Sequence, residues 1–215
     1  MPFTYQDIDG ILQKTAGLGK YYTLAGGGAL IWHLKHRVTD DVDIYLEPNT
    51  WDEEKTPFLI FKAFESLIPT NDLLKVISHI KHSGMNVTKI FFEKGTVSMI
   101  QNGSMTLFEK ERLFPPNRLP VATMNEIFLG KIAALGGRDK EIDQDDLAYI
   151  FSHNDNWDVD YTIKNIGGRK MEYFTFQKAF RKLSEMPQIR GINKEVIAKI
   201  HAFGQAGLSK LGNSP

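Results

Sequence analysis

The chain has no cysteine among its 215 residues, which excludes disulfides, thiolate zinc sites and cysteine nucleophiles. It has no apolar run near the roughly 20 residues that span a bilayer. Its first residues also lack the basic and apolar regions of a signal peptide. No excess of one charge is present, because 26 Lys and Arg balance 26 Asp and Glu. We therefore expect a cytoplasmic protein without a membrane partner.

The neutral total hides an uneven distribution of charge along the chain. From residue 161 onward there are ten Lys and Arg and three Glu, a balance of +7, so residues 1–160 carry −7. An acidic first part suits metal binding, and a basic last part could face an anionic partner such as RNA. Ordinary solvated helix faces would give the same distribution, so both interpretations stay open.

Residues 21–46 have the pattern of a strand, a glycine turn, a helix and a second strand. We expect strands at 21–25 and 42–46 and a helix at 29–35. Gly26, Gly27 and Gly28 fall between the first strand and the helix, where backbone N–H groups at a helix start can bind phosphate oxygens. A tight turn needed only for packing is the alternative.

Two carboxylates alternate with apolar residues in the second strand. Asp41 and Asp43 point to one face of a strand, while Val42 and Ile44 point to the other, into the core. Carboxylates placed in this way can share a hard divalent cation. Asp40 points with Val42, so we expect it to be solvent-exposed or a turn cap and to play no part in binding a metal. An exposed strand edge with scattered acids is the alternative interpretation.

The rest of the chain divides into a mixed first part and a helical second part. Further helices are expected at 4–16, 50–64 and 71–81. The turns Lys94-Gly95 and Asn102-Gly103 predict an antiparallel meander of strands 87–93, 96–101 and 104–108. Prolines at 115 and 116 place a boundary after residue 117. Beyond it, helices are expected at 124–135, 143–151, 158–166, 172–183 and 194–203.

Taken together, the glycines and carboxylates resemble a known signature. Gly26-Gly27, a gap of thirteen residues and then Asp41-Val42-Asp43-Ile44 is similar to the motif of the DNA polymerase beta-like nucleotidyltransferase superfamily. The strings from Gly26 to Leu30 and from His36 to Asp43 resemble one branch, the AbiEii/MenT-type nucleotidyltransferases of type IV toxin–antitoxin systems. Lys131, Arg138 and the block Asp143–Leu147 resemble a second motif of that branch.

The resemblance implies an α+β fold in two parts. Residues 1–117 would form a nucleotidyltransferase-like mixed sheet with flanking helices, and residues 118–215 a helical bundle that contributes Lys131 and Asp143 to the cleft. By the same resemblance Asp41 and Asp43 would hold Mg²⁺, Lys131 would neutralise charge on the triphosphate, and Asp143 would orient an active-site partner. The other nucleotide-binding residues that it implies are Gly26, Gly27, Gly28, Arg37, Thr39, Arg138 and Asp146.

The function so implied is Mg²⁺-dependent transfer of NMP from an NTP to an RNA, such as a tRNA 3′ end, or to a protein. A toxin-like role with an antitoxin partner would follow. The sequence departs from the family pattern at two points. Glu93 is the only candidate for the third carboxylate that many of these enzymes have, and Ile142 stands where the family usually has an arginine before its last motif. A non-catalytic nucleotide- or partner-binding module on a degenerate fold is therefore the alternative. A plain helical interaction protein with accidental glycines and acids is the third.

Two histidines, His33 and His36, lie one helical turn apart and could be read as metal ligands. No cysteine joins them and no third ligand is evident. We expect a structural role for both.

Overall fold

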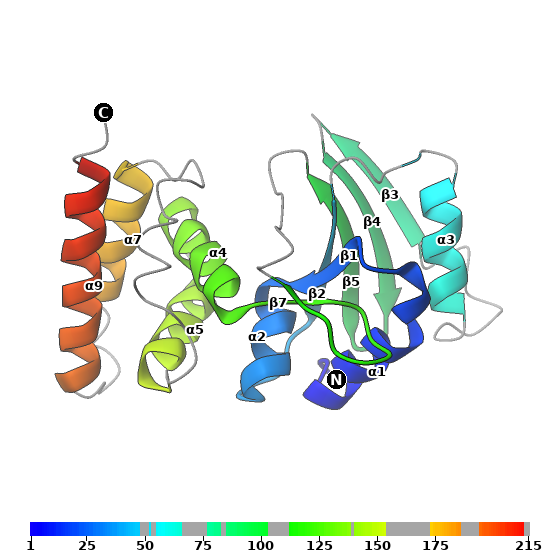
Figure 1. Ribbon diagram of the computed structural model, residues 1–215, viewed down its shortest axis with the longest axis horizontal. Coiled ribbons are helices and arrows are strands. Elements are labelled where there is room, and N and C mark those ends of the chain that lie inside the picture. The colour runs from blue at the N-terminus through cyan, green and yellow to red at the C-terminus, as the bar shows by residue number, and fades with distance from the viewer. Residues whose placement is uncertain are drawn as a thin grey trace. The chain divides into compact units, whose positions relative to one another are not determined.

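The chain folds as two compact units, Met1–Thr123 and Met124–Pro215, in the computed structural model (Figure 1). The sequence-based boundary after residue 117 falls six residues earlier. The structure describes residues 1–47, 52, 55–65, 77–82, 85–102, 112–138, 140–153, 173–185 and 194–212.

The first unit is a seven-stranded mixed sheet with flanking helices, which confirms the predicted α+β fold class. Strand order in the sheet is β3-β4-β5-β2-β1-β7-β6. The pairs β2–β5 and β1–β7 are parallel and the other neighbours are antiparallel. Its elements are α1 (Tyr5–Lys14), the short helix η1 (Ala16–Leu18), β1 (Tyr22–Ala25), α2 (Gly26–Leu34), β2 (Asp41–Leu46), α3 (Lys55–Phe64), β3 (Ile77–His82), β4 (Met85–Phe92), β5 (Gly95–Asn102), β6 (Arg112–Leu113) and β7 (Val121–Ala122).

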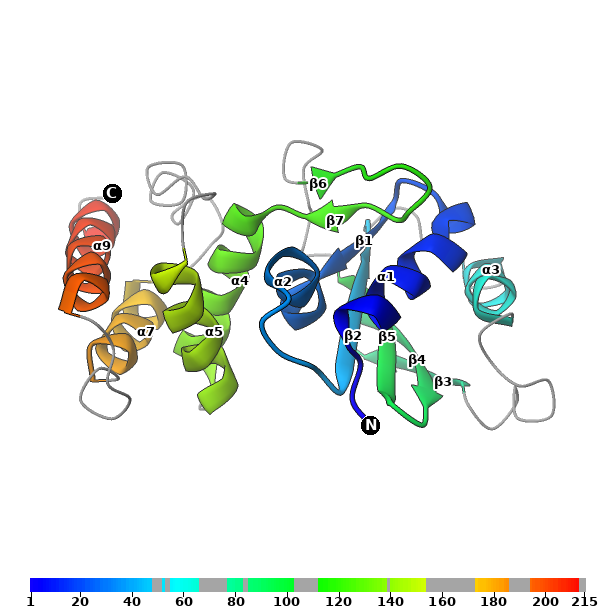
Figure 2. The ribbon, with the colours of Figure 1, turned by 90° about the horizontal axis from the view of Figure 1, so that it is seen from below.

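One face of this sheet forms the core of the unit. Val42 and Ile44 of β2 are completely buried there, as their alternation with the two carboxylates predicts. Gly28 of α2 lies against Val42, and Phe64 of α3 packs on Phe92 of β4. Helix α1 packs beside α2, which Figure 2 shows from below. The helices thus cover the Val42 face of the sheet.

Asp9 connects α1 to α2 and to the segment before β7. Its carboxylate accepts two hydrogen bonds from Arg118, at 2.7 and 3.0 Å, and one from the Trp32 indole at 3.1 Å. The hydrogen bonds from Arg118 are the main reason why the pKa of Asp9 is lowered to about 2, against the opposing effect of burial. This ion pair fixes the helix layer over the sheet.

Segment 77–82 differs from its prediction, because the expected helix at 71–81 is a strand over Ile77–His82. The spacing of the apolar residues suits a helix, but Ile77 pairs with Ile90 in an antiparallel ladder that the local pattern does not reveal. The turn at Lys94-Gly95 is confirmed as the connection between β4 and β5. The predicted strand 104–108 and helix 158–166 lie outside the described residues.

The second unit is helical. Helix α4 packs against α5 and α7, and α9 packs against α7 and α5. Phe128, Phe151 and Phe203 meet edge to face, with ring centroids 5.1 to 5.8 Å apart. None of the helices in the described parts of the chain has the length and apolarity needed to cross a membrane. The described helices of this unit are α4 (Met124–Gly137), α5 (Glu141–Ser152), α7 (Tyr173–Glu185) and α9 (Lys194–Gly212).

Candidate functional site

Strand pairing brings the glycines next to the carboxylates. Strand β1 runs antiparallel to β2, and Ala25 at its end pairs with Asp43. Gly26 follows directly and has a φ of +57°, a conformation that favours glycine. A Cβ atom placed on Gly26 would lie 3.1 Å from Oδ2 of Asp43. The carboxylate therefore sits against the backbone at the start of α2.

Helix α2 begins at the glycines and not at residue 29, where its start was predicted. All three glycines are in its first turn, so their N–H groups belong to the helix end that attracts anions. The N-cap position is Ala25, which makes no side-chain hydrogen bond to this turn. The start of α2 is thus suited to accept phosphate oxygens from a ligand.

Arg37 adds a positive charge at this helix end. A Cβ atom placed on Gly27 would lie 2.9 Å from Nη2 of Arg37, so the guanidinium lies over the glycine. Nη1 of Arg37 donates to the carbonyl of Val38 at 2.9 Å, which holds the group in place. The phosphate contact predicted for Arg37 stays a prediction.

The carboxylate pair lies on the face of β2 opposite the core. Asp41 is exposed and Asp43 is half-buried. The Thr39 hydroxyl donates to the Asp41 carbonyl at 3.0 Å and accepts from the Asp41 N–H at 3.2 Å. Thr39 itself pairs through its backbone with Phe3 near the N-terminus. Thr39 therefore shapes the start of the acidic strand.

Glycine is also required where the segment before Asp41 meets the neighbouring turn. The Asp40 carbonyl accepts from the Thr96 N–H at 2.7 Å. A Cβ atom on Gly95 would come within 2.0 Å of that carbonyl oxygen, and the φ of Gly95 is +142°. Asp40 thus contributes its backbone to the sheet, and its exposed side chain is consistent with the solvent exposure predicted for it.

Strand β5, the parallel neighbour of β2, offers hydroxyl groups beside the carboxylates. Thr96 pairs with Asp41 and Ser98 pairs with Asp43. Glu93, the candidate third carboxylate, is exposed and lies in the turn after β4. Among the described residues, no three His, Asp or Glu side chains are grouped so that they could hold a metal ion. Any cation bound here would therefore be held by Asp41 and Asp43 together with groups that a bound ligand supplies.

The donor set fits Mg²⁺ in kind. Asp41 and Asp43 supply hard carboxylate oxygens from one strand face, and Mg²⁺ is commonly bound by one or two carboxylates together with phosphate oxygens and water. The helix end with Arg37 would hold the phosphates of such a complex. The arrangement is therefore suited to a nucleotide that brings its metal with it.

The helical unit contains a buried ionic network. Nζ of Lys131 lies 2.9 Å from Asp143 and 2.7 Å from Asp146, and both aspartates are completely buried. Arg138 donates to both oxygens of Asp143, at 2.8 and 3.1 Å. Burial alone would raise the pKa of Asp143, but the hydrogen bonds from Arg138 and Lys131 outweigh it and hold that pKa below its usual value.

Four predicted site residues of the helical unit, Lys131, Arg138, Asp143 and Asp146, are thus brought together. Asp143 touches both cations, which suits the orienting role that the resemblance implies for it. The phosphate contact predicted for Lys131 stays a prediction, because its ammonium already serves two carboxylates in the structure.

Lys182 of α7 is a buried cation that the sequence did not single out. Its Nζ donates to the carbonyls of Leu135 and Arg138, at 2.8 and 2.9 Å. It thereby satisfies the end of α4 next to the ionic network. The only sequence signal was a lysine on the apolar side of an amphipathic helix, which usually indicates a surface residue.

His33 has the structural role predicted for it. Its Nε2 lies 2.9 Å from the Ala122 carbonyl, which can only accept, so Nε2 carries the proton. Burial lowers the pKa of His33, and the hydrogen bond to Ala122 opposes this effect only in part. The histidine therefore connects α2 to β7.

Comparison with known proteins gives a fold relationship. No model of a protein family matches the chain, and no curated protein sequence matches it. The fold is similar to that of an H. pylori protein described as a "putative nucleotidyltransferase", with a TM-score of 0.55, 14% identity and coverage of 97% of this chain and 95% of that one. It is also similar to JHP933 from Helicobacter pylori, with a TM-score of 0.56, 15% identity and coverage of 97% and 92%. The chain therefore has a nucleotidyltransferase-like fold.

Proposed function

We propose that this protein is a Mg²⁺-dependent nucleotidyltransferase that moves an NMP unit from an NTP to a macromolecular acceptor. The observation that carries the proposal is the pairing of Ala25 with Asp43. This pairing sets an anion-binding helix end, Gly26–Gly28, against a pair of carboxylates that can hold a cation. The nucleotidyltransferase-like fold supports it.

The reaction is a single displacement at phosphorus. A hydroxyl oxygen of the acceptor forms a bond to the α-phosphorus, the bond from that phosphorus to the bridging oxygen breaks, and pyrophosphate leaves with the electron pair. The hydroxyl proton passes to solvent. Mg²⁺, when bound by Asp41 and Asp43, neutralises negative charge on the phosphates.

Residues of this chain would act by position and charge. The N–H groups of Gly27 and Gly28 would hold phosphate oxygens, and Arg37 would add a charged donor. The two aspartates would serve as ligands and not as acid or base. Such catalysis needs no covalent intermediate.

The helical unit would support the reaction through Lys131. We propose that Asp143 and Asp146 orient the Lys131 ammonium, which contacts both carboxylates, and that Arg138 fixes Asp143. The resemblance of Lys131, Arg138 and Asp143–Leu147 to the AbiEii/MenT motif supports these roles.

The same resemblance supports a toxin-like activity with an antitoxin partner. An RNA acceptor would also suit the basic C-terminal region. On its described helices, Lys178, Arg181, Lys194 and Lys199 are exposed. A steep loss of RNA binding with added salt would support contacts of this kind, and a flat salt response would contradict them.

A non-catalytic nucleotide-binding module is the competing function. The observation in its favour is that Thr96 and Ser98 stand in register with Asp41 and Asp43, where a further carboxylate would complete a metal site. Such a module would bind an NTP with Mg²⁺ and transfer nothing.

The deciding experiment is incubation with each labelled NTP, Mg²⁺, total RNA and protein acceptors. We expect label in one acceptor class with the native protein and none with Asp43→Asn, because the substitution removes one metal ligand. Asp40→Asn is the matched control, since it removes an exposed carboxylate three residues away, and it should transfer normally. Equal transfer by Asp43→Asn would contradict the assignment. Nucleotide binding without transfer in any condition would favour the module.

A further inference from the structure

The sheet face that carries Asp41 and Asp43 continues across two more strands. On this face Asp41, Thr96 and Phe91 form one row across β2, β5 and β4. The next row contains Asp43, Ser98 and Lys89. Residues paired across adjacent strands point to the same side of a sheet. Phe91 and Lys89 therefore lie on the carboxylate face.

This face is more exposed than the core face at Phe91, Lys89 and Thr96, whereas Ser98 and Val87 on it are buried. Phe91 is 46% exposed, and Lys89 and Thr96 are half-buried. On the core face of the same two strands, Ile90 and Val97 are completely buried. A large aromatic side chain is thus exposed in a strand whose opposite face is packed. Burial in the core does not explain its presence.

The distance from Phe91 and Lys89 to the two aspartates suits a polymeric ligand that extends across the sheet from the carboxylates. Neighbouring strands lie about 4.8 Å apart, so two strand spacings place Phe91 and Lys89 roughly 10 Å from the two aspartates at the backbone. An aromatic ring accepts a stacked base and a lysine accepts a phosphate, and this combination is typical of proteins that bind single-stranded nucleic acids.

We propose that this face binds the 3′ end of a single-stranded RNA, with a base on Phe91 and a phosphate on Lys89, and so directs the terminal hydroxyl toward the carboxylate pair. The inference rests on the proposed function, for which an RNA acceptor is already implied, and adds to it the surface and the residues that hold the acceptor. The half-buried hydroxyl of Thr96, between Asp41 and Phe91, faces the ribose of the bound end.

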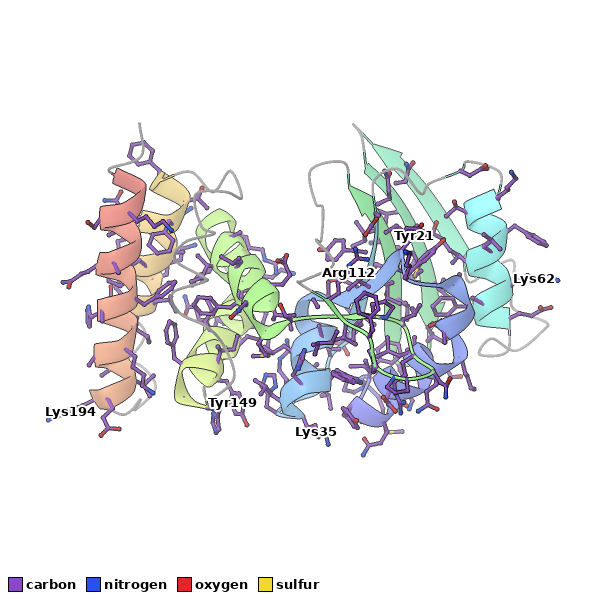
Figure 3. The ribbon with its side chains drawn as sticks, viewed as in Figure 1. Tyr21, Lys35, Lys62, Arg112, Tyr149 and Lys194 are labelled. Atoms are coloured by element: carbon purple, nitrogen blue, oxygen red, sulfur yellow. The ribbon has the colours of Figure 1, made fainter. Side chains whose placement is uncertain are left out.

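The chain offers a matched control on the other side of the sheet. Phe58 of α3 is 58% exposed, and the Lys62 ammonium lies 5.6 Å from its ring centroid. Lys62 is labelled on α3 in Figure 3. Because α3 packs on the core face through Phe64 and Phe92, this aromatic and cationic pair belongs to the opposite side.

The test measures binding of a labelled single-stranded RNA with a 3′-hydroxyl to the full chain, without NTP. We expect Phe91→Ala to weaken binding about five- to hundredfold, the usual range for loss of one stacked base. Phe91→Trp should retain it. Lys89→Ala should reduce the slope of binding against salt by about one phosphate contact. Phe58→Ala and Lys62→Ala should leave both quantities unchanged.

Binding of labelled NTP with Mg²⁺, measured on the same variants, separates this inference from the proposed function. Unchanged NTP binding with weakened RNA binding supports the inference. Equal RNA binding by Phe91→Ala and Phe58→Ala, with transfer intact, overturns it and leaves the proposed function standing. Transfer to proteins alone overturns it as well. Failure of the proposed function would give a different result: the native protein would bind RNA and NTP tightly but would transfer nothing.

Discussion

Oδ2 of Asp43 lies against Gly26, 3.1 Å from the position that a Cβ atom would occupy. The contact joins the strand that carries the acidic pair to the helix whose first turn we propose to bind phosphate. A side chain at residue 26 would therefore press on the Asp43 carboxylate. Substitutions at these glycines therefore report on the candidate site.

Gly26→Ala should both destabilise the fold and displace the Asp43 carboxylate. A left-handed conformation at a residue with a side chain costs about 1–2 kcal/mol, so the free energy of unfolding should fall by about that amount. Urea unfolding measures it. Gly10→Ala in α1 is the control, because a Cβ there meets nothing within 4 Å. It should raise stability by about 0.5–1 kcal/mol. Equal stability of the two variants would argue against strain at Gly26.

Gly27→Ala should separate binding from stability. The new Cβ would lie 2.9 Å from Nη2 of Arg37, and this flexible side chain can move away at little cost to the fold. If Arg37 contacts phosphate, NTP affinity should fall about tenfold to a hundredfold, as loss of a charged hydrogen bond predicts. Calorimetry with NTP and Mg²⁺ would measure it. Because both substitutions disturb the same Arg37 contact, adding Arg37→Ala to Gly27→Ala should lower NTP affinity little further. Fully additive losses of affinity would show that the two residues act independently.

Asp143→Asn should weaken the helical unit in a pH-dependent way. The substitution removes the charged partner of Arg138 and one of the two carboxylates that Lys131 contacts, at a cost of about 1–3 kcal/mol near neutral pH. The folded pKa of Asp143 is lowered from 3.8, so its contribution is present above that value and is lost as the pH falls below it. The stability difference from the native chain should therefore shrink in acid. Glu141→Gln, which alters an exposed residue of α5, should show no comparable change.

Gly204→Ala should disrupt the packing of α9 on α7. A Cβ on Gly204 would lie 1.8 Å from the Phe180 ring, and one on Gly207 would lie 2.3 Å from the Phe176 ring. Overpacking of this kind costs about 1–3 kcal/mol, which thermal unfolding would detect. Phe180→Leu should restore part of the loss by making room. Gly130→Ala on α4 meets nothing within 4 Å and should not destabilise. No rescue by Phe180→Leu would place the cause elsewhere.

The amino-acid sequence by itself determined the local elements of the candidate site. Alternation of Asp41, Val42, Asp43 and Ile44 predicts a strand with one acidic and one buried face, because successive side chains point to opposite sides. Glycines before an apolar segment predict a turn into a helix. The resemblance grouped Lys131, Arg138 and Asp143 in one motif, and the structure brings the three side chains into contact through Asp143.

Tertiary structure alone decided which segments lie beside one another. The register of Ala25 with Asp43, the parallel pairing that sets Ser98 beside Asp43, and the strand at Ile77–His82 all depend on hydrogen bonds between distant segments. Such partners leave no trace in local periodicity, because each strand shows only which of its faces is apolar. For the same physical reason, Phe91 and Lys89 could be placed on the carboxylate face only once the sheet was assembled.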